Sequence, residues 1–487
     1  MSRPRKVAVT IAAIAVALLV VLLVPETPPN VTPPDGRPFV WGRDALWTRL
    51  ERRFDRARAA GCPSVTARLD EELAALDARL DEVERGTAGP DDPALDALER
   101  QTFEIVPRFG ACQRRASELV PRMSRLRRAV KERSERWSMD DRAARDRLYR
   151  LLYGSRAALE ELLLQVPPGT VPALMEGEGE PSRAPSVRVH GVTLHSGDVL
   201  LSRGGAPTSA LIARGNDYPG NFSHVALLHV SEDGTPTVIE SHIESGVGTS
   251  SADRYLADTK LRILVLRLRS DLDPIVQEPL LPHRAAQVAL ERARAGHVAY
   301  DFPMDWQDGE EQFCSEVAYA PYAAHGVRLW QGLSSMSGRG LTSWLGAFGV
   351  RHFETLAPSD LEYDPQVRVV AEWRDPQALF SDHLDNAVSD ALLARAEQGE
   401  EVGYDYARLP LARLAKAYSV LFNVFGGLGP IPEGMSATVA LRVEWLRARH
   451  RRLRARLEAR AADYRREHHR RAPYWTLVAM ATEEAAR

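Results

Sequence analysis

Apolar residues follow helical spacing at both ends of the chain and strand-like runs in its middle. Between Val65 and Val83, leucines and valines recur at steps of three and four, which predicts an amphipathic helix. A second helix is expected to begin near Pro107, and a third to run from about Asp140 to Leu164. Together these segments predict a helical hairpin or small bundle over residues 43–166.

The pattern changes after a segment rich in Pro, Gly and Glu, residues 167–190, which indicates a linker. The Glu232-Asp233-Gly234 turn predicts a hairpin, and two helices are expected, from about Pro282 to Ala295 and from about Gln312 to Ala324. Residues 191–375 therefore predict an α+β domain. Five short apolar runs are its expected strands: Asp198–Ser202, Phe222–Val230, Thr237–Ser241, Leu261–Leu268 and Val367–Trp373.

Residues 376–487 return to helical spacing, interrupted at Gly426–Pro432. The last predicted helix, near Ser436–Arg471, is heavily basic. Such a helix could lie on anionic lipid, but an ordinary solvated helix is the commoner case. The net charge of −3 gives no global argument for nucleic-acid binding, and we expect no nucleic-acid partner.

The first 25 residues predict a membrane anchor. Val7–Val24 carries no charge and follows Arg3, Arg5 and Lys6. A helix of this length covers roughly 27 Å, close to the thickness of a bilayer core, and the basic flank should stay cytoplasmic. A cleaved signal peptide is the alternative, but no small-x-small site follows the run. We expect a single-pass protein of a bacterial-type inner membrane, with residues 26–42 as a Pro-rich tether on the extracytoplasmic, periplasmic side.

The three cysteines suit an oxidising compartment. Cys62 and Cys112 both fall in the N-terminal helical region, and a disulfide between them would close a loop of about fifty residues. Unpaired buried cysteines are the alternative. Under the disulfide hypothesis, Cys314 remains a free thiol.

Cys314 is the candidate nucleophile. It lies in QFCSEVAYA, where a helix is expected to begin, and the amides of a first helical turn favour a thiolate and can bind an oxyanion. His224, in NFSHVALLHV, is the candidate base; strand alternation places it on one face and His229 on the other. Glu240, in the next strand, is placed to orient the imidazole, with His242 as the reserve candidate. A lone cysteine or histidine is more often structural, so the hypothesis rests on the combination.

These residues belong to an ordered set of short motifs: GDVL (197–200), NFSHVALL (221–228), VIES (238–241), GV (246–247), AYDF (299–302), FCSEV (313–317) and APSDLEYDP (357–365). In this order they resemble the circularly permuted papain-like, NlpC-type cysteine hydrolases, and more closely the YiiX/YebB-like branch. In that branch the histidine strand precedes the cysteine helix. The resemblance covers about 185 residues and leaves both helical flanks unexplained. Pro321, soon after Cys314, departs from the helical pattern.

The resemblance implies a papain-like fold with Cys314, His224 and Glu240 in the catalytic positions and with Tyr300 and Asp301 lining the substrate pocket. It implies amide cleavage in the cell envelope, of peptidoglycan stem peptides or acyl-amides, through a thioester. A lipid acyltransferase or esterase of the same fold and a non-catalytic envelope scaffold are the alternatives. No P-loop, GxSxG or HExxH motif occurs, so we expect neither cofactor nor metal.

Overall fold

The computed structural model describes residues 20–487 except residues 21, 28–30, 41–44, 88, 168 and 333. Most of the predicted anchor, residues 1–25, lies outside the described residues. Within the part that is described, no helix combines the length and the apolar character needed to cross a bilayer.

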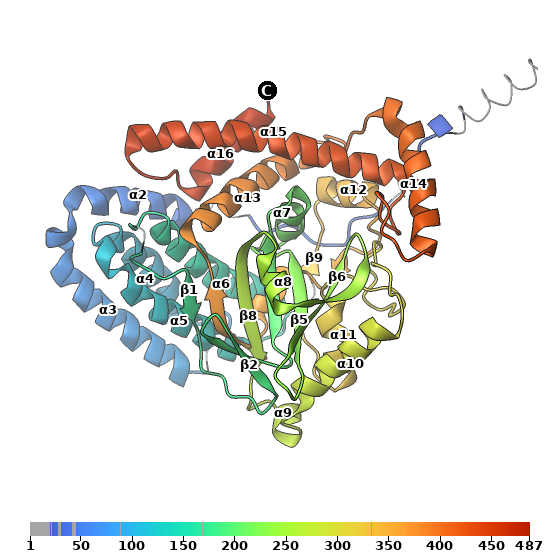
Figure 1. The fold of residues 1–487 in the computed structure, drawn as a ribbon. Coiled ribbons are helices and arrows are strands. Elements are labelled where there is room, and N and C mark those ends of the chain that lie inside the picture. Colours follow the sequence, from blue (N-terminus) through green and yellow to red (C-terminus); the bar gives the residue numbers. More distant parts are fainter. Residues whose placement is uncertain are drawn as a thin grey trace, which may run out of the picture.

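A seven-stranded antiparallel sheet occupies the centre of the molecule, in the order β1-β11-β8-β4-β5-β6-β7 (Figure 1). All five predicted strands are present, and the predicted hairpin joins β5 to β6. The strands are β1 (Leu174–Glu176), β4 (Val199–Gly204), β5 (His224–Val230), β6 (Pro236–His242), β7 (Gly246–Ser251), β8 (Lys260–Leu268) and β11 (Val367–Trp373).

The sheet extends beyond the predicted strands at both edges. β1 lies inside the predicted linker and pairs with β11, so part of that segment is an edge strand. Its three residues show no alternation long enough to be recognised. A separate hairpin, β2 (Ser186–Val189) with β3 (Val192–His195), covers one face of the sheet, and β9 (Ser334–Ser335) pairs with β10 (Glu354–Thr355).

The predicted N-terminal helices form a bundle, with one correction. The prediction of a helix that begins near Pro107 is wrong. Pro107 lies in the last turn of α4, and a short 3-10 helix (Gln113–Glu118) separates α4 from α5. Neither α2 nor α4 was predicted. The bundle helices are α2 (Ala45–Ala60), α3 (Cys62–Arg85), α4 (Pro93–Phe109), α5 (Leu119–Ser134) and α6 (Arg142–Leu163).

Helices also cover the sheet and one end of the molecule. α10 and α11 were predicted, whereas the other helices of the central region were not. They are α7 (Pro207–Arg214), α8 (Ala252–Ala257), α9 (Asp273–Gln277), α10 (Leu281–Ala295), α11 (Glu316–Ala324) and α12 (Arg339–Ala347). The C-terminal helices are α13 (Pro376–Glu397), α14 (Leu409–Val424), α15 (Ala437–His468) and α16 (Tyr474–Ala485).

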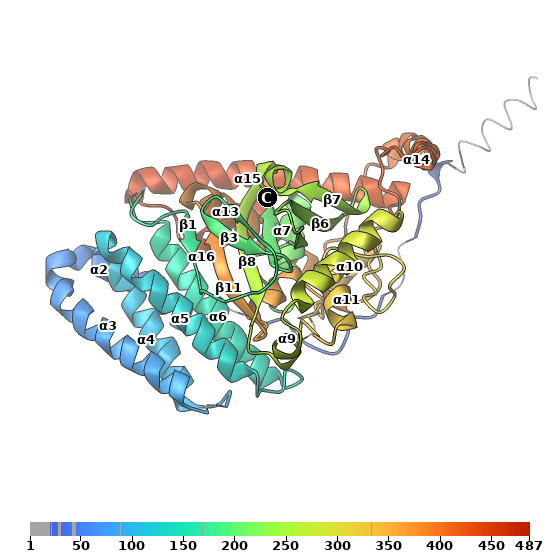
Figure 2. The same ribbon diagram turned by 60° about the horizontal axis from the view of Figure 1, so that its bottom comes forward.

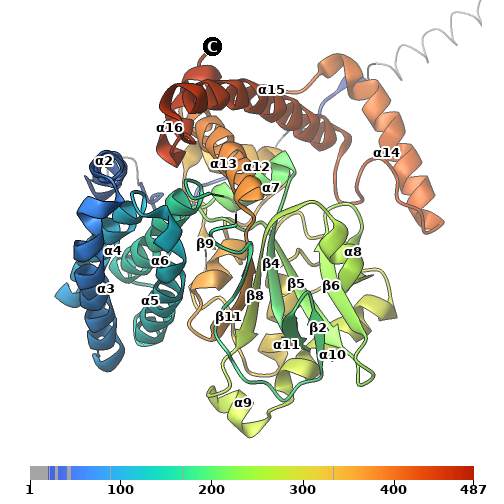
Figure 3. The same ribbon diagram turned by 60° about the vertical axis from the view of Figure 1, so that its left-hand side comes forward.

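Strand alternation divides the sheet into two apolar faces. Val225 and Leu227 of β5 pack with α10 and α11, whereas Ala226 and Leu228 pack with the β2–β3 hairpin and α8. The bundle α2–α6 lies beside the β11 edge, and α13, α15 and α16 lie across one end of the sheet (Figures 2 and 3). The sheet is therefore covered by layers contributed by distant parts of the chain.

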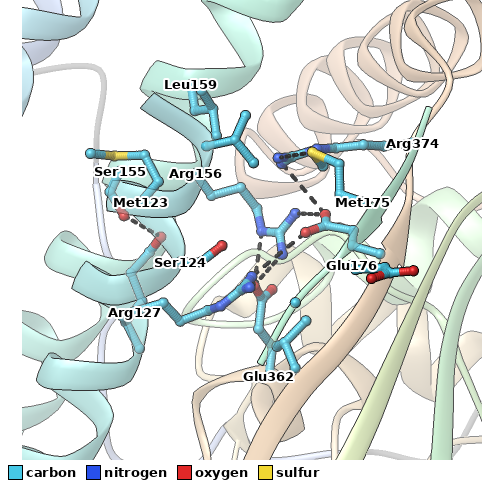
Figure 4. Close-up of a pocket in the computed structure, with 15 residues that line it drawn as sticks. Met123, Ser124, Arg127, Ser155, Arg156, Leu159, Met175, Glu176, Glu362 and Arg374 are labelled. Atoms are coloured by element: carbon cyan, nitrogen blue, oxygen red, sulfur yellow. Dashed lines mark hydrogen bonds and ion pairs between the residues drawn. The ribbon is translucent and has the colours of Figure 1, made fainter. Parts of the chain in front are cut away.

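A buried cluster of charges joins the bundle to the sheet and to α13. In this arginine network, Arg262 of β8 contacts Glu160 of α6 and Asp382 of α13 at 2.5 Å each. Arg156 of α6 donates to Glu362 and Glu372 (Figure 4). These side chains are no more than 6% exposed. Buried charges of this kind are tolerated only when each finds partners.

A disulfide joins Cys62 to Cys112, as the sequence analysis proposed, and Cys314 is the free cysteine. Cys62 begins α3, and Cys112 follows α4 directly. The bond therefore connects two parts of the bundle whose neighbouring leucines share one core.

Candidate active site

Cys314 lies in a turn that leads into α11. The helix begins at Glu316, so the cysteine precedes the first helical turn by two residues and does not lie within it as expected. The reason is local: the Phe313 N–H donates to Glu316 Oε2 at 2.8 Å and the Glu316 N–H donates to Phe313 O, which holds a turn ahead of the helix. Cys314 is 6% exposed.

His224 is the first residue of β5, and its imidazole lies between Cys314 and Glu240. Its Nε2 is 2.9 Å from Glu240 Oε2, and its ring lies close enough to Cys314 for the two side chains to shift each other's pKa. Because Nε2 is taken by the carboxylate, Nδ1 is the nitrogen available to the thiol. The structure thus brings together the three residues that the sequence analysis assigned to catalysis.

Glu240 is held from two further sides. Ser250 Oγ of β7 donates to Glu240 Oε1 at 3.1 Å, and His242 Nε2 lies 3.3 Å from the same oxygen. The side chain of His242 is 45% exposed, whereas that of Glu240 is 6% exposed. His242, the reserve candidate, therefore supports Glu240 from the solvent side.

The charges at this site favour an ion pair. Burial alone raises the pKa of the Cys314 thiol, but the hydrogen bond and charge of His224 outweigh it, so the net pKa is lowered. Burial lowers the pKa of His224, but the contacts with Cys314 and Glu240 raise it to about 9. Burial raises the pKa of Glu240, and the two histidines hold it well below its usual range. The lowered pKa of the thiol and the raised pKa of the imidazole both favour a thiolate beside an imidazolium.

The loop before Cys314 is fastened to the sheet that carries Glu240. Ser241 Oγ donates to the carbonyl of Gln312 at 2.6 Å, and the Val247 N–H donates to Val298 O at 2.9 Å. Gly246, at φ 68°, packs so closely that a Cβ there would lie 2.0 Å from Val298 O. This contact explains the glycine of the GV motif.

Tyr300 and Asp301, the two residues predicted to line the substrate pocket, make different contacts. Tyr300 packs edge-on against Phe302, and burial followed by the nearby Cys314 charge raises the pKa of its phenol well above the usual range. Asp301 Oδ1 instead accepts from the Met304 N–H at 2.9 Å, and burial raises its pKa to about 6. Tyr300 is thus electrostatically coupled to the thiol, while Asp301 holds a turn.

Sequence reasoning missed Ser250 and Tyr255. The Tyr255 ring is buried, and burial, followed by the charges of Glu240, Asp258 and Cys314, raises the pKa of its phenol. Neither residue lies in one of the motifs quoted above, so only pairing of β6 with β7 and packing of α8 place them here.

Two main-chain amides can serve a developing oxyanion. Among the described residues, the N–H groups of Cys314 and Ser315 have no hydrogen-bond acceptor. They lie at the thiol and at the residue after it, so they are available to an oxygen bound beside the thiol.

The same cluster also contains a possible metal donor set. The ring nitrogens of His224 and His242 and a Glu240 oxygen lie within 4.8 Å of one another. Two imidazoles and a carboxylate suit Zn²⁺. An ion there would replace the His224–Glu240 hydrogen bond, so metal binding would compete with orientation of the base. The expectation that the protein needs no metal stays a prediction.

A histidine strand that precedes a cysteine turn and helix, both packed on one antiparallel sheet, defines the class of permuted papain-like proteins. Residues 193–371 match the family described as permuted papain-like amidase enzymes, YaeF/YiiX, C92 family. This segment is therefore a permuted papain-like domain, and the resemblance found in the sequence is confirmed. Both helical flanks lie outside the match.

One solved structure, titled as the metalloprotein yiiX from Escherichia coli O157:H7, is similar at 21% identity and a TM-score of 0.29. The similarity covers 37% of this chain and 98% of that chain. No curated protein matches the chain.

Proposed function

We infer from the family match that this protein is an amide-cleaving hydrolase. We propose that this protein is a membrane-tethered, extracytoplasmic cysteine amidase that acts through Cys314, His224 and Glu240. The observation that carries the proposal is the imidazole of His224, which contacts the thiol on one side and the carboxylate on the other. The uncharged run at residues 7–24 and the disulfide support the location.

In the first half-reaction the Cys314 thiolate attacks the amide carbonyl carbon, and the oxyanion forms beside the amides of Cys314 and Ser315. The C–N bond then breaks, and the His224 imidazolium gives its proton to the leaving amine. The product is a thioester on Cys314. In the second half-reaction His224 accepts a proton from water, which attacks the thioester and releases the acid. Glu240 keeps the imidazole in position and stabilises its charged form.

An apolar cavity favours an acyl-amide over a stem peptide as the substrate. A cavity of about 380 Å³ lies on the sheet face that carries Leu228 and Val238, and its lining includes Tyr255. Strand alternation places His224 and Glu240 on this same face. Sites that bind apolar groups have a mostly apolar lining of this kind. A polar peptide would find few polar groups in the cavity.

The second candidate reaction is transfer of the acyl group to an acceptor other than water. Hydrolysis and acyl transfer both pass through the same thioester. A non-catalytic scaffold is the third. A scaffold has no need for a charged thiol held beside an imidazole, and this argues against it.

Full-length protein incubated with an N-acyl amino acid and with a stem-peptide fragment tests the proposal. We expect mass spectrometry to find the acyl group as a thioester on Cys314, absent from Cys314→Ala and unaffected by a metal chelator. Equal, slow labelling of wild type and His224→Ala by a thiol probe would favour the scaffold. Activity that survives Cys314→Ala but is lost on chelation would exclude thiol chemistry.

A further inference from the structure

Helix α14 presents its large apolar residues to solvent. Leu411, Leu414, Tyr418, Leu421 and Phe425 follow steps of three and four, so they share one face, and each is 55–79% exposed. Of the sixteen large apolar side chains that are exposed in the described part of the chain, ten lie between residues 406 and 428: Tyr406, Leu411, Leu414, Tyr418, Val420, Leu421, Phe422, Val424, Phe425 and Leu428. A contiguous patch of this kind marks an interaction surface.

The inward face of α14 is already occupied. Ala412 and Ser419 are buried on it, and the chain returns over them after the helix. The Ile431 N–H donates to Ser419 Oγ at 3.0 Å, and Lys416 Nζ donates to Pro432 O at 2.8 Å. The orientation of the helix is therefore fixed with its small residues inward, the reverse of an ordinary surface helix.

The charge of this segment suits an anionic lipid surface. No Asp or Glu occurs between Tyr406 and Pro432, whereas Arg408, Arg413 and Lys416 are present. Apolar residues flanked by cations and free of acidic residues are typical of helices that lie in the headgroup layer. A water-soluble partner protein would not require this exclusion of acidic residues.

The first described residues lie against α14 and the start of α15. The Arg413 guanidinium of α14 donates to the Val24 carbonyl, and the Glu26 N–H donates to Thr438 Oγ1 of α15 at 3.3 Å. Val24 is the last residue of the uncharged run that begins at Val7. Figures 1 and 3 show α14 at the periphery of the molecule. A tether that leaves a bilayer at Val24 would therefore hold α14 at its surface.

We propose that α14 and the following segment Phe425–Leu428 dock in the headgroup layer of an anionic bilayer. This inference rests on the proposed tether and extends it, because docking fixes how the catalytic domain faces the membrane. Ile243, next to His242, and Phe302, next to Asp301, share a core with the inward face of α14. Docking thus brings the active site close to lipids that carry acyl-amide bonds.

Depth-dependent quenching tests the docking. An environment-sensitive probe is attached to Leu421→Cys in a full-length Cys314→Ser chain, reconstituted in nanodiscs of phosphatidylcholine and phosphatidylglycerol at one chain per disc. Val276→Cys in α9, an equally exposed apolar position (63% against 61%), is the matched control. We expect brominated acyl chains to quench the probe at residue 421 severalfold more than the probe at residue 276.

Equal, weak quenching at the two positions would overturn the proposal. Shielding of residue 421 from both bromolipid and aqueous iodide would also overturn it, because protein, such as residues 7–19, would then cover the helix. A chain that does not float with lipid refutes the tether and the docking together. The quenching measurement does not depend on hydrolysis. A failure of the docking proposal can therefore be distinguished from a failure of the proposed amidase activity.

Discussion

The arginine network and the candidate active site are both buried clusters of charged side chains, and they differ in residue type. The arginine network pairs guanidinium groups with carboxylates, whereas the candidate active site pairs a thiol and an imidazole with one carboxylate. An arginine keeps its proton at any physiological pH, so the network can only hold elements together. A thiol and an imidazole exchange protons near neutrality, so the same burial there produces a reactive pair.

The second difference is whether the hydrogen-bond donors of the cluster have acceptors. Arg262 and Arg156 each contact at least two carboxylates, whereas the amides of Cys314 and Ser315 have no acceptor among the described residues. A cluster whose groups are satisfied stabilises the fold, and one that leaves donors open can bind a reacting atom.

Cys314→Ala separates the two clusters most strongly. We expect activity to fall at least about a thousandfold, because no thioester can form. Thermal unfolding should stay close to that of wild type, since only one sulfur is removed. A large loss of thermal stability would show that Cys314 is mainly structural.

Glu160→Gln should have the opposite effects. It leaves Arg262 and Arg156 buried with less compensation, and removal of one partner from a buried pair costs about 3–5 kcal/mol. Denaturant unfolding measures this loss, and kcat of the folded fraction should be unchanged. Asp463→Asn is the matched control, because its pair with Arg466 is exposed and should contribute no more than about 1 kcal/mol. Equal effects of the two variants would contradict a stabilising role for the network.

Glu240→Gln should reduce kcat by roughly one to two orders of magnitude. This loss should be smaller than that of His224→Ala, because the orienting residue of a triad contributes less than its base. The matched variant is His242→Ala, which leaves the His224–Glu240 contact in place and should cost less still. Wild-type kcat in Glu240→Gln would move the orienting role to another residue.

The pH profile tests the ion pair directly. The pKa of His224 is raised to about 9, so kcat/KM should persist up to that pH and fall above it. The raised pKa of His224 also contributes stability that is fully present below about pH 6.5 and is lost as pH rises through about 9. In Glu240→Gln one of the groups that raise this pKa is removed, and the upper limb should move to lower pH. An unchanged upper limb would mean that Glu240 does not act on His224.

Tyr300→Phe should have the smallest effect. Loss of one hydrogen bond to the acyl group or oxyanion is expected to lower kcat/KM by no more than about tenfold. Tyr319→Phe, in the same apolar core, should not change kcat/KM. If both variants behave alike, Tyr300 serves packing only.

The proximity of the three candidate catalytic residues could be predicted from the sequence better than their surroundings, and their catalytic roles stay a prediction. The order of the motifs singled out Cys314, His224 and Glu240, because a short turn and strand alternation suffice to place two facing side chains. Ser250 and Tyr255 were missed, since their contacts depend on the packing of β7 and α8 onto β6. The prediction of a helix that begins near Pro107 was wrong because Pro107 lies inside the last turn of α4, a position that proline occupies less often than a helix start.

Periodicity and motif order by themselves predicted the five central strands and the helical segments on either side of them, and the three cysteines made a Cys62–Cys112 disulfide one of two alternatives. Each depends on residues close in sequence or on the small number of cysteines. Only the tertiary structure decided the edge strand β1, the arginine network and the outward face of α14. Their partners lie far away along the chain, as with Glu160 and Asp382, and no local spacing specifies which distant surface an amphipathic segment meets.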